Sequence, residues 1–342
     1  MKEFSVLLTC CGNHISERIR NLKENEDGVN VRVYACNSHE DNLPFGCDVE
    51  GCFVVPAIHE PDYIETVIRI CEENCIDIII PTVTLELEFM AEHREDFEKR
   101  GIKVSIASPE AIRISNNKLF LYDRYSSLMP PTIATKDFHD LLSFRSRIAS
   151  GHKLCVKLQD HCGGNGFAIL DEDKARDMTY FNRKNDNQYV SYEEMERIMH
   201  RLDKPILLQE YIEGNDYSVS VLADDGKVMH ICGYAGYAIE HGAIEYGEIM
   251  YNPKAYEIAK MICEDLCLDG NACFDFRISP NGDVYLLEVN PRVNASLPFV
   301  AEAGINMLYL RCKRLLGEFD ESPKRIQYGL KMKKYHESRY FL

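Results

Sequence analysis

The chain has 342 residues, enough for two or three structural units, and 45% of them are hydrophobic, as is ordinary for a globular protein. Its formal net charge of −16 argues against a general nucleic-acid or anionic-membrane binder, although a local cluster of Lys and Arg can still hold an anionic nucleotide. No signal peptide or membrane-length apolar stretch is apparent, so we expect a cytoplasmic protein whose 14 cysteines are reduced thiols.

Residues 1–108 alternate strand and helix signals, which predicts a βαβ series and hence a doubly wound parallel sheet. Such sheets bind ligands beyond the carboxyl ends of their strands, so loops 9–14 and 81–86 are candidate ligand-facing edges. The GxGxxG fingerprint is missing after the first strand, which disfavours a nicotinamide-dependent dehydrogenase. The expected strands are 4–10, 29–36, 53–56, 76–80 and 103–107, and the expected helices are 14–23, 62–74 and 85–100.

Residues 109–204 are predicted to form a small lobe. Helical turns with capping signals end at Pro130-Pro131, because two prolines cannot lie inside a helix. A strand over 153–158 then leads into a glycine-rich turn and a second short strand. The stretch 171–204 is charged and helical, as expected for a solvated part of the lobe.

The glycine-rich turn HCGGNGF spans residues 161–167. Gly163, Gly164 and Gly166 allow backbone N–H groups to point at an anion without side-chain obstruction. No GK[ST] follows, so the turn is not a Walker A loop, and we predict a flap over polyphosphate instead. Lys157 lies on the strand that enters the flap. Taken alone, it is about equally suited to binding a nucleotide phosphate and to extending into water.

Residues 205–320 are predicted to form a C-terminal lobe of longer strands, with helices over 251–268 and 301–316. Residues 321–342 are a basic tail, in which six Lys/Arg and one Glu follow Ser322. We expect this tail to be solvated or loosely docked. The strands are expected at 206–212, 217–224, 227–235, 273–279 and 283–289.

The stretch LLEVNPRVN carries Glu288, Asn290 and Arg292 at every second position. In an extended chain such positions share one face, and burying these groups without partners would cost several kcal/mol. The neighbouring apolar residues are expected to face the core; they are Leu286, Leu287 and Val289.

Asn281-Gly282 is a strong hairpin signal that places Asp275 almost opposite Glu288. Two carboxylates and the amide oxygen of Asn290 suit Mg²⁺, which completes its octahedron with water and phosphates. The alternative is a solvated sheet face on which Arg292 pairs with one of the acids. These residues alone favour the two interpretations nearly equally.

The segment LLQEYIEGND offers backbone N–H and C=O groups in a slot that could recognise an adenine edge, around Gln209, Glu210 and Ile212. Asp216, beyond the turn, could accept hydrogen bonds from ribose hydroxyls.

In order and spacing, four segments resemble the ATP-grasp superfamily, and most of all its branch similar to the carbamoyl-phosphate-synthetase large subunit. The segments are NNK at 116–118, CVKLQDHCGGNGF at 155–167, LLQEYIEGNDYSV at 207–219 and FDFRISPNGDVYLLEVNPRVN at 274–294. The resemblance implies an N-terminal doubly wound domain, at 1–108, and a two-lobed ATP-grasp module, at 109–204 and 205–320. One grasp module is too few for a full carbamoyl-phosphate synthetase, which carries two.

The resemblance also implies ATP and one or two Mg²⁺ ions, with Mn²⁺ as an alternative. Arg292 and Lys157 would be the catalytic residues, with Arg292 near the transferred phosphoryl group. Arg277 and His241 are candidates for a further phosphate-binding cation, unless Arg277 pairs with Glu288. The cofactor-binding set would be Lys118, Lys157, Gly163, Gly164, Gly166, Gln209, Glu210, Ile212 and Asp216, and the metal set Asp275, Glu288 and Asn290.

The implied function is a ligase that activates a small-molecule carboxylate as an acyl phosphate and joins it to an amine, with a thiol as the other nucleophile considered. A small-molecule kinase, a carbamoyl-phosphate-type phosphoryl transfer and a non-catalytic nucleotide-binding regulator are the alternatives. The expected partners are small-molecule substrates, without nucleic acid or membrane, and a homodimer is left open.

Overall fold

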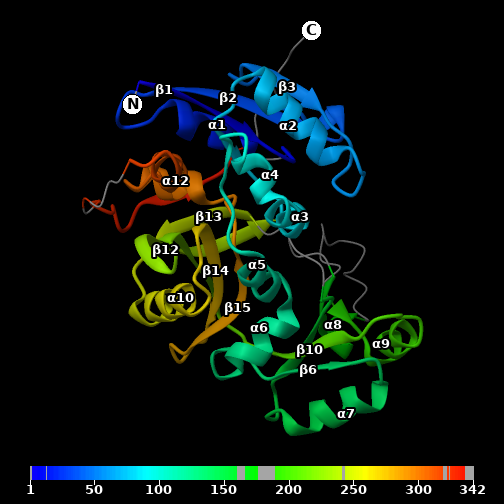
Figure 1. Cartoon of the computed structure of the whole chain (residues 1–342). Coiled ribbons are helices and arrows are strands. Elements are labelled where there is room, and N and C mark those ends of the chain that lie inside the picture. Colours follow the sequence, from blue (N-terminus) through cyan, green and yellow to red (C-terminus); the bar gives the residue numbers. More distant parts are fainter. Residues whose placement is uncertain are drawn as a thin grey trace.

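Three β-sheets organise the computed structural model, which describes residues 2–12, 14–159, 166–175, 189–240, 243–318, 322 and 324–335. In Figure 1 the N-terminal sheet lies at the top, a six-stranded sheet lies in the middle, and the smaller lobe lies below and to the right. The predicted fold class, a doubly wound domain followed by a two-lobed module, is confirmed. No helix among the described residues is both long and apolar enough to cross a lipid bilayer.

The N-terminal sheet is entirely parallel, as predicted, with strand order β3-β2-β1-β4-β5. The order reverses between β1 and β4, which is where sheets of this kind leave a crevice for a ligand. The predicted helix over 85–100 is instead a short 3₁₀ turn and two helices that meet at His93. The elements are β1 (Glu3–Leu8), α1 (Ile15–Lys23), β2 (Asn30–Asn37), β3 (Gly51–Val54), α2 (Tyr63–Glu73), β4 (Ile78–Ile80), η2 (Thr84–Glu86), α3 (Leu87–Glu92), α4 (Arg94–Glu98) and β5 (Lys103–Val104).

The small lobe contains a five-stranded sheet of order β6-β10-β7-β8-β9. Strand β10 lies between β6 and β7 in this sheet, although the boundary predicted after residue 204 assigned it to the C-terminal lobe. Helices α5 and α6 pack into the core shared by the N-terminal and large lobes. The elements are α5 (Pro109–Asn116), α6 (Lys118–Tyr125), η3 (Ser126–Leu128), β6 (Thr132–Thr135), α7 (Phe138–Arg147), β7 (Lys153–Lys157), β8 (Phe167–Leu170), α8 (Glu172–Ala175), β9 (Tyr189–Val190), α9 (Tyr192–Met199) and β10 (Ile206–Tyr211).

The large lobe is built on an antiparallel sheet of order β15-β14-β11-β12-β13-β16. The predicted hairpin at Asn281-Gly282 joins β14 to β15, and Gly282 has the positive φ of 85° that this turn requires. The elements are β11 (Asn215–Asp224), β12 (Lys227–Glu240), β13 (Ala243–Ile249), α10 (Pro253–Asp265), β14 (Gly270–Ile278), β15 (Val284–Asn290), α11 (Leu297–Glu302), α12 (Met307–Leu315) and β16 (Lys331–Lys333).

Two predictions for the C-terminal region are wrong. The helix expected over 301–316 is two helices, because the chain turns at Gly304, where φ is 110° and a Cβ would lie 2.5 Å from the carbonyl oxygen of Arg325. The described part of the basic tail, residues 322 and 324–335, is not loosely docked: β16 pairs with β13, and apolar residues of this part pack against the core. Those residues, interleaved with the basic ones, are Ile326, Leu330 and Met332.

A buried ion pair within the large lobe also reaches the N-terminal domain, through a hydrogen bond to Ser105. The guanidinium of Arg311, with a side chain 1% exposed, donates two 2.8 Å hydrogen bonds to the carboxylate of Asp269 and one of 3.2 Å to Ser105 Oγ. We expect Asp269→Ala to lower the free energy of unfolding by about 3 kcal/mol, because it leaves a buried guanidinium without its counter-charge. Urea unfolding measures this.

The double variant Asp269→Leu with Arg311→Met is the control for that experiment. Because it removes both charges, we expect it to lose less stability than Asp269→Ala alone. If Asp269→Ala were the more stable of the two, the buried guanidinium of Arg311 would not depend on Asp269 as described.

Candidate functional site

The β14–β15 hairpin brings Asp275 and Glu288 directly opposite each other, as their Cα register shows. The register then slips, because the next pair is Phe276 with Leu286, so Leu287 has no partner on β14. This bulge overturns one prediction. Leu286 and Val289 face the core, at 0% and 2% exposure, whereas Leu287 is half-buried and lines a pocket.

The two carboxylates are held by a shared hydrogen-bond donor. The Nδ2 of Asn290 lies 3.1 Å from Asp275 Oδ2 and 3.1 Å from Glu288 Oε1. Ser218 Oγ donates a further hydrogen bond of 2.6 Å to Asp275 Oδ1. Burial and the neighbouring Glu288 raise the pKa of Asp275 to about 7. Burial alone would also raise the pKa of Glu288, but the charge of Lys118 and the hydrogen bond from Asn290 bring it below its ordinary value.

This donor set fits a hard divalent cation. Two carboxylates and one carboxamide are the oxygen ligands that Mg²⁺ takes from a protein when phosphates and water supply the rest. Within the described residues no group of three His, Cys, Asp or Glu could hold a metal, and the set at this site is two carboxylates and one carboxamide. The amide oxygen of Asn290 accepts from Arg292 Nη2 at 3.1 Å, so the amide must turn over before this oxygen can face a cation.

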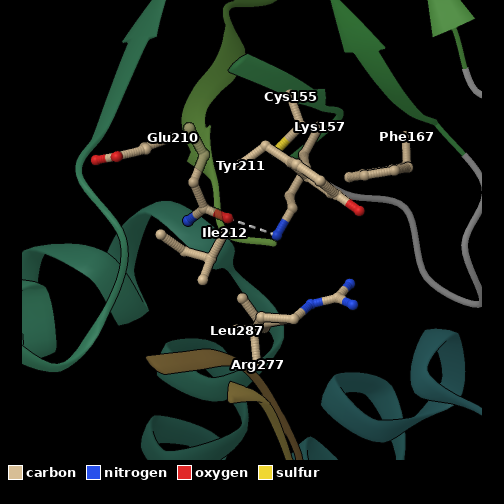
Figure 2. A pocket seen from close by; sticks show the side chains of 9 residues that line it. Cys155, Lys157, Phe167, Glu210, Tyr211, Ile212, Arg277 and Leu287 are labelled. Carbon is tan, nitrogen blue, oxygen red and sulfur yellow. Dashed lines mark hydrogen bonds between the residues drawn. The ribbon is translucent and has the colours of Figure 1, made fainter. Parts of the chain in front are cut away.

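Two lysines lie beside the carboxylates. Lys118 opens α6, and its Nζ is 3.5 Å from Glu288 Oε2. Lys157 ends β7, and its Nζ donates a 2.7 Å hydrogen bond to Gln209 Oε1. Burial lowers the pKa of Lys157, an effect that Glu288 partly offsets. Figure 2 shows this amine pointing into the pocket, where an anionic ligand would stabilise its charge.

A pocket under the small lobe contains the residues expected to frame adenine. Gln209, Glu210 and Ile212 all contribute to its lining. The side chain of Gln209 already has protein partners, since its Nε2 donates a 2.8 Å hydrogen bond to Thr132 Oγ1. Glu210 bonds His152 and is directed away from Lys157 (Figure 2). Backbone N–H and C=O groups would therefore have to recognise an adenine base in this pocket. The lining residues are Cys155, Lys157, Phe167, Gln209, Glu210, Tyr211, Ile212, Arg277 and Leu287.

Arg277 pairs with Asp216, at 3.1 Å, and donates a 3.1 Å hydrogen bond to the carbonyl oxygen of Gly214. The predicted alternative, a pair with Glu288, is wrong because the register places Arg277 beside Tyr285 on β15 and beside Asp216 on β11. Burial raises the pKa of Asp216, and Arg277 opposes that rise.

The predicted flap lies mostly outside the described residues, which exclude Gly163, Gly164 and also His241. Gly166 is described. It has a positive φ of 69°, and its carbonyl oxygen accepts a 3.0 Å hydrogen bond from the backbone N–H of Leu158. The closing role of the flap stays a prediction.

Arg292 connects the hairpin to the N-terminal domain. Its Nε donates a 3.1 Å hydrogen bond to Thr84 Oγ1, in the loop that follows β4. That loop is anchored by the fully buried carboxylate of Glu86, which accepts from Thr9 Oγ1 at 2.7 Å and from the Thr82 backbone N–H at 2.7 Å. The predicted ligand-facing loops therefore meet the hairpin at Arg292.

Sequence reasoning missed several residues of this site, because each depends on a contact between segments far apart in the chain. Ser218 had a signal, since it alternates with buried residues along a predicted strand. Thr84 and Glu86 lie in the predicted ligand-facing loop 81–86 but were not singled out, and Thr132 and His152 carried no signal.

Comparisons with known proteins agree with this architecture. Residues 203–338 match the family described as ATP-grasp in the biosynthetic pathway with Ter operon, and residues 6–105 match the PylC-like N-terminal domain. Among curated relatives, the carbamoyl phosphate synthase large chain of Xanthomonas axonopodis pv. citri is 26% identical over 60% of this chain and 19% of its own length. The Buchnera aphidicola chain of the same name is 23% identical over 86% of this chain and 26% of its own length. This chain thus spans about a quarter or less of these relatives.

Solved structures share the fold. N5-carboxyaminoimidazole synthetase from Staphylococcus aureus, complexed with ADP, superposes with a TM-score of 0.67 at 13% identity, covering 96% of this chain and 81% of that one. L-amino acid ligase from Bacillus licheniformis gives 0.64 at 16% identity, covering 96% and 78%. Partial family matches, distant curated relatives and the shared fold agree, and this chain is similar to ATP-grasp proteins over residues 203–338 and to the PylC-like N-terminal domain over residues 6–105.

Proposed function

We propose that this chain is an ATP- and Mg²⁺-dependent ligase that activates a small-molecule carboxylate as an acyl phosphate and joins it to an amino-acid-like amine. The observation that carries the proposal is the cluster of Asp275, Glu288 and Asn290 with Lys118, beside the pocket that holds Lys157. In a chain of net charge −16, such a local group of cations beside two carboxylates suits a metal-bound polyphosphate.

The chemistry needs positioning and charge neutralisation more than it needs a protein nucleophile. Lys157 and Lys118 would bind phosphate oxygens, and Arg292 would stabilise the charge that develops on the transferred group. Mg²⁺ on Asp275, Glu288 and Asn290 would neutralise the phosphates when bound. The carboxylate of the substrate attacks the terminal phosphorus, ADP leaves, and an amine then displaces phosphate from the acyl phosphate.

The names of the relatives and of the proteins with the same fold support the same class of enzyme, an ATP-dependent ligase. One neighbour is an amino acid ligase and another a synthetase complexed with ADP. We also propose that the protein works in the cytoplasm, because the 13 cysteines that the structure describes are all free thiols. A homodimer stays a prediction, which light scattering would test.

The testing experiment is ADP release screened across carboxylic acids and amino acids, with hydroxylamine present to trap an acyl phosphate. A ligase yields ADP, inorganic phosphate and an amide, and a hydroxamate when hydroxylamine replaces the amine. A kinase leaves the phosphate on its substrate, and a regulator binds ATP without turnover. Tight ATP binding with no hydroxamate from any acid would contradict the proposal.

A further inference from the structure

A row of four side chains crosses the large sheet from the candidate metal site into the interior. Asp275 lies opposite Glu288 on β15 and opposite Ser218 on β11, and Ser218 in turn lies opposite Tyr234 on β12. Residues directly opposite each other in a sheet point to the same face. The row therefore joins the two carboxylates at one end to the buried side chain of Tyr234, 1% exposed, at the other.

A second row on the same face, two residues along, connects Tyr234 to Asp275 by hydrogen bonds. Cys273 and Ser220 lie opposite each other in this row and are buried, at 3% and 0% exposure. The hydroxyl of Tyr234 lies 3.6 Å from Cys273 Sγ and 2.9 Å from Ser220 Oγ. Cys273 Sγ donates to Asp275 Oδ1 at 3.6 Å, so the thiol bridges the tyrosine and the carboxylate.

Asn294, in the segment after β15, is the donor at the far end of this network. Its Nδ2 donates a 2.7 Å hydrogen bond to the hydroxyl of Tyr234 and one of 3.3 Å to Ser220 Oγ. Because this hydroxyl accepts from Asn294, its own proton is available for Cys273, whose thiol proton then goes to Asp275. The donors thus point along the chain towards Asp275, and the negative charge of its carboxylate favours that alignment.

The network fixes one oxygen of the Asp275 carboxylate. Oδ1 accepts from Cys273 and also from Ser218, at 2.6 Å, whereas Oδ2 accepts from Asn290 Nδ2 at 3.1 Å. When the amide of Asn290 turns its oxygen towards a cation, the same movement withdraws the donor from Oδ2. The carboxylate would then offer Oδ2 to the cation, while Oδ1 stays held by the sheet.

We infer that Tyr234 is a positioning residue for the metal ligand Asp275 and that it acts through Cys273. This inference rests on the proposed function, because it takes Asp275 as a ligand of Mg²⁺. Hydrogen bonds that orient a metal ligand typically contribute about 10- to 100-fold to metal affinity. Tyr234 is not among the described residues that line the pocket of Lys157, so its hydroxyl should affect the binding of the metal and not that of the nucleotide.

The test is isothermal titration calorimetry of a non-hydrolysable ATP analogue into the full chain, in saturating Mg²⁺ and in EDTA. The Kd in EDTA divided by the Kd in Mg²⁺ gives the metal-dependent gain in affinity. Tyr234→Phe keeps the buried ring and loses the hydroxyl, and we expect it to lower this gain by about 10-fold, with the Kd in EDTA unchanged within about twofold. An unchanged gain in Tyr234→Phe, or no gain in the wild type, would overturn the inference.

Tyr217→Phe is the matched control for a loss of stability. Tyr217 is also buried on this sheet, at 2% exposure, but it precedes Ser218 on β11 and so points to the other face, where its hydroxyl donates a 2.8 Å hydrogen bond to the carbonyl oxygen of Met250. Both variants should unfold at a lower urea concentration than the wild type, yet Tyr217→Phe should keep the full metal-dependent gain. An equal fall of the gain in both variants would assign the effect to a loosened sheet and overturn the positioning role.

Cys273→Ala tests the route from Tyr234 to Asp275. The substitution removes the thiol that donates to the carboxylate, so it should lower the metal-dependent gain as well. If Tyr234 acts through Cys273, the double variant should match Cys273→Ala alone, whereas two independent losses would multiply and contradict the route. Should Tyr234→Phe fail to fold, Cys273→Ala carries the test, and an unchanged gain in that variant would overturn the inference.

These results are separable from failure of the proposed function, because the titration involves no turnover. A protein whose Tyr234→Phe variant loses the metal-dependent gain, but which makes no hydroxamate from any acid, keeps the positioning role and loses the ligase. A protein that makes hydroxamates while Tyr234→Phe keeps the full gain keeps the ligase and loses the positioning role.

Discussion

Replacement of Glu288 by glutamine is expected to abolish Mg²⁺-dependent turnover and leave the fold intact. The substitution keeps the volume of the side chain but removes one of the two carboxylates in the metal set, and with it the charge beside Lys118. We expect turnover to fall by about 10³-fold, in line with the loss of one electrostatic group in a buried site. Steady-state ADP release at saturating ATP, measured over a range of Mg²⁺ concentrations, gives the result.

The same variant should unfold slightly below the wild-type temperature. The pKa of Glu288 lies below its ordinary value, because Lys118 and Asn290 favour the charged carboxylate, and glutamine loses that stabilisation. Glu264→Gln, on the exposed face of α10, is the matched control and should keep full activity. Near-normal turnover in Glu288→Gln would show that the metal set is misassigned.

Replacement of Lys157 by methionine should weaken ATP binding without lowering the stability of the fold. The Lys157 amine lies in the pocket beside Leu287 and Phe167, bonded to the amide oxygen of Gln209. The loss of a charge-assisted contact to phosphate costs about 1.5–3 kcal/mol, hence a rise of about 10- to 100-fold in the KM for ATP. Stability should be kept or gained, because burial already lowers the pKa of this lysine.

Lys153→Met serves as the comparison for that measurement. Lys153 opens the same strand, but it is paired with Asp171 at 2.7 Å and lies outside the pocket that Lys157 lines. The KM of Lys153→Met for ATP should change by less than about twofold, because this amine does not line the pocket. An unchanged KM in Lys157→Met would assign that amine to the support of Gln209 and not to phosphate.

Much of the fold could be predicted because its signals are local. Alternating apolar periods located the parallel strands, Ser108 and Asn117 capped α5 and α6 as capping signals suggested, and Asn281-Gly282 located the hairpin. The errors came from long-range effects. Docking turned the basic tail into a strand, and contact with Arg325 placed a break at Gly304.

The candidate site, too, was predicted where its signals are local and missed where they depend on long-range contacts. Period-two spacing along β15 and the turn before it were enough to bring Asp275, Glu288 and Asn290 together. The bulge at Leu287 could not be predicted, because one extra residue in a strand does not change the types of residue that make up its sequence pattern. The hydrogen bond from Arg292 to Thr84 joins residues that are 208 positions apart in the chain, so only the assembled structure reveals it.

The central claim, activation of a carboxylate as an acyl phosphate, is tested most directly by isotope transfer. The acid that supports ADP release is supplied with ¹⁸O in both carboxylate oxygens, and the inorganic phosphate formed is analysed by mass spectrometry. A carboxylate oxygen that attacks the terminal phosphorus stays on that phosphate when the amine displaces it. We predict inorganic phosphate carrying a single ¹⁸O per turnover. Unlabelled phosphate, with all ¹⁸O retained in the acid or its product, would contradict the account.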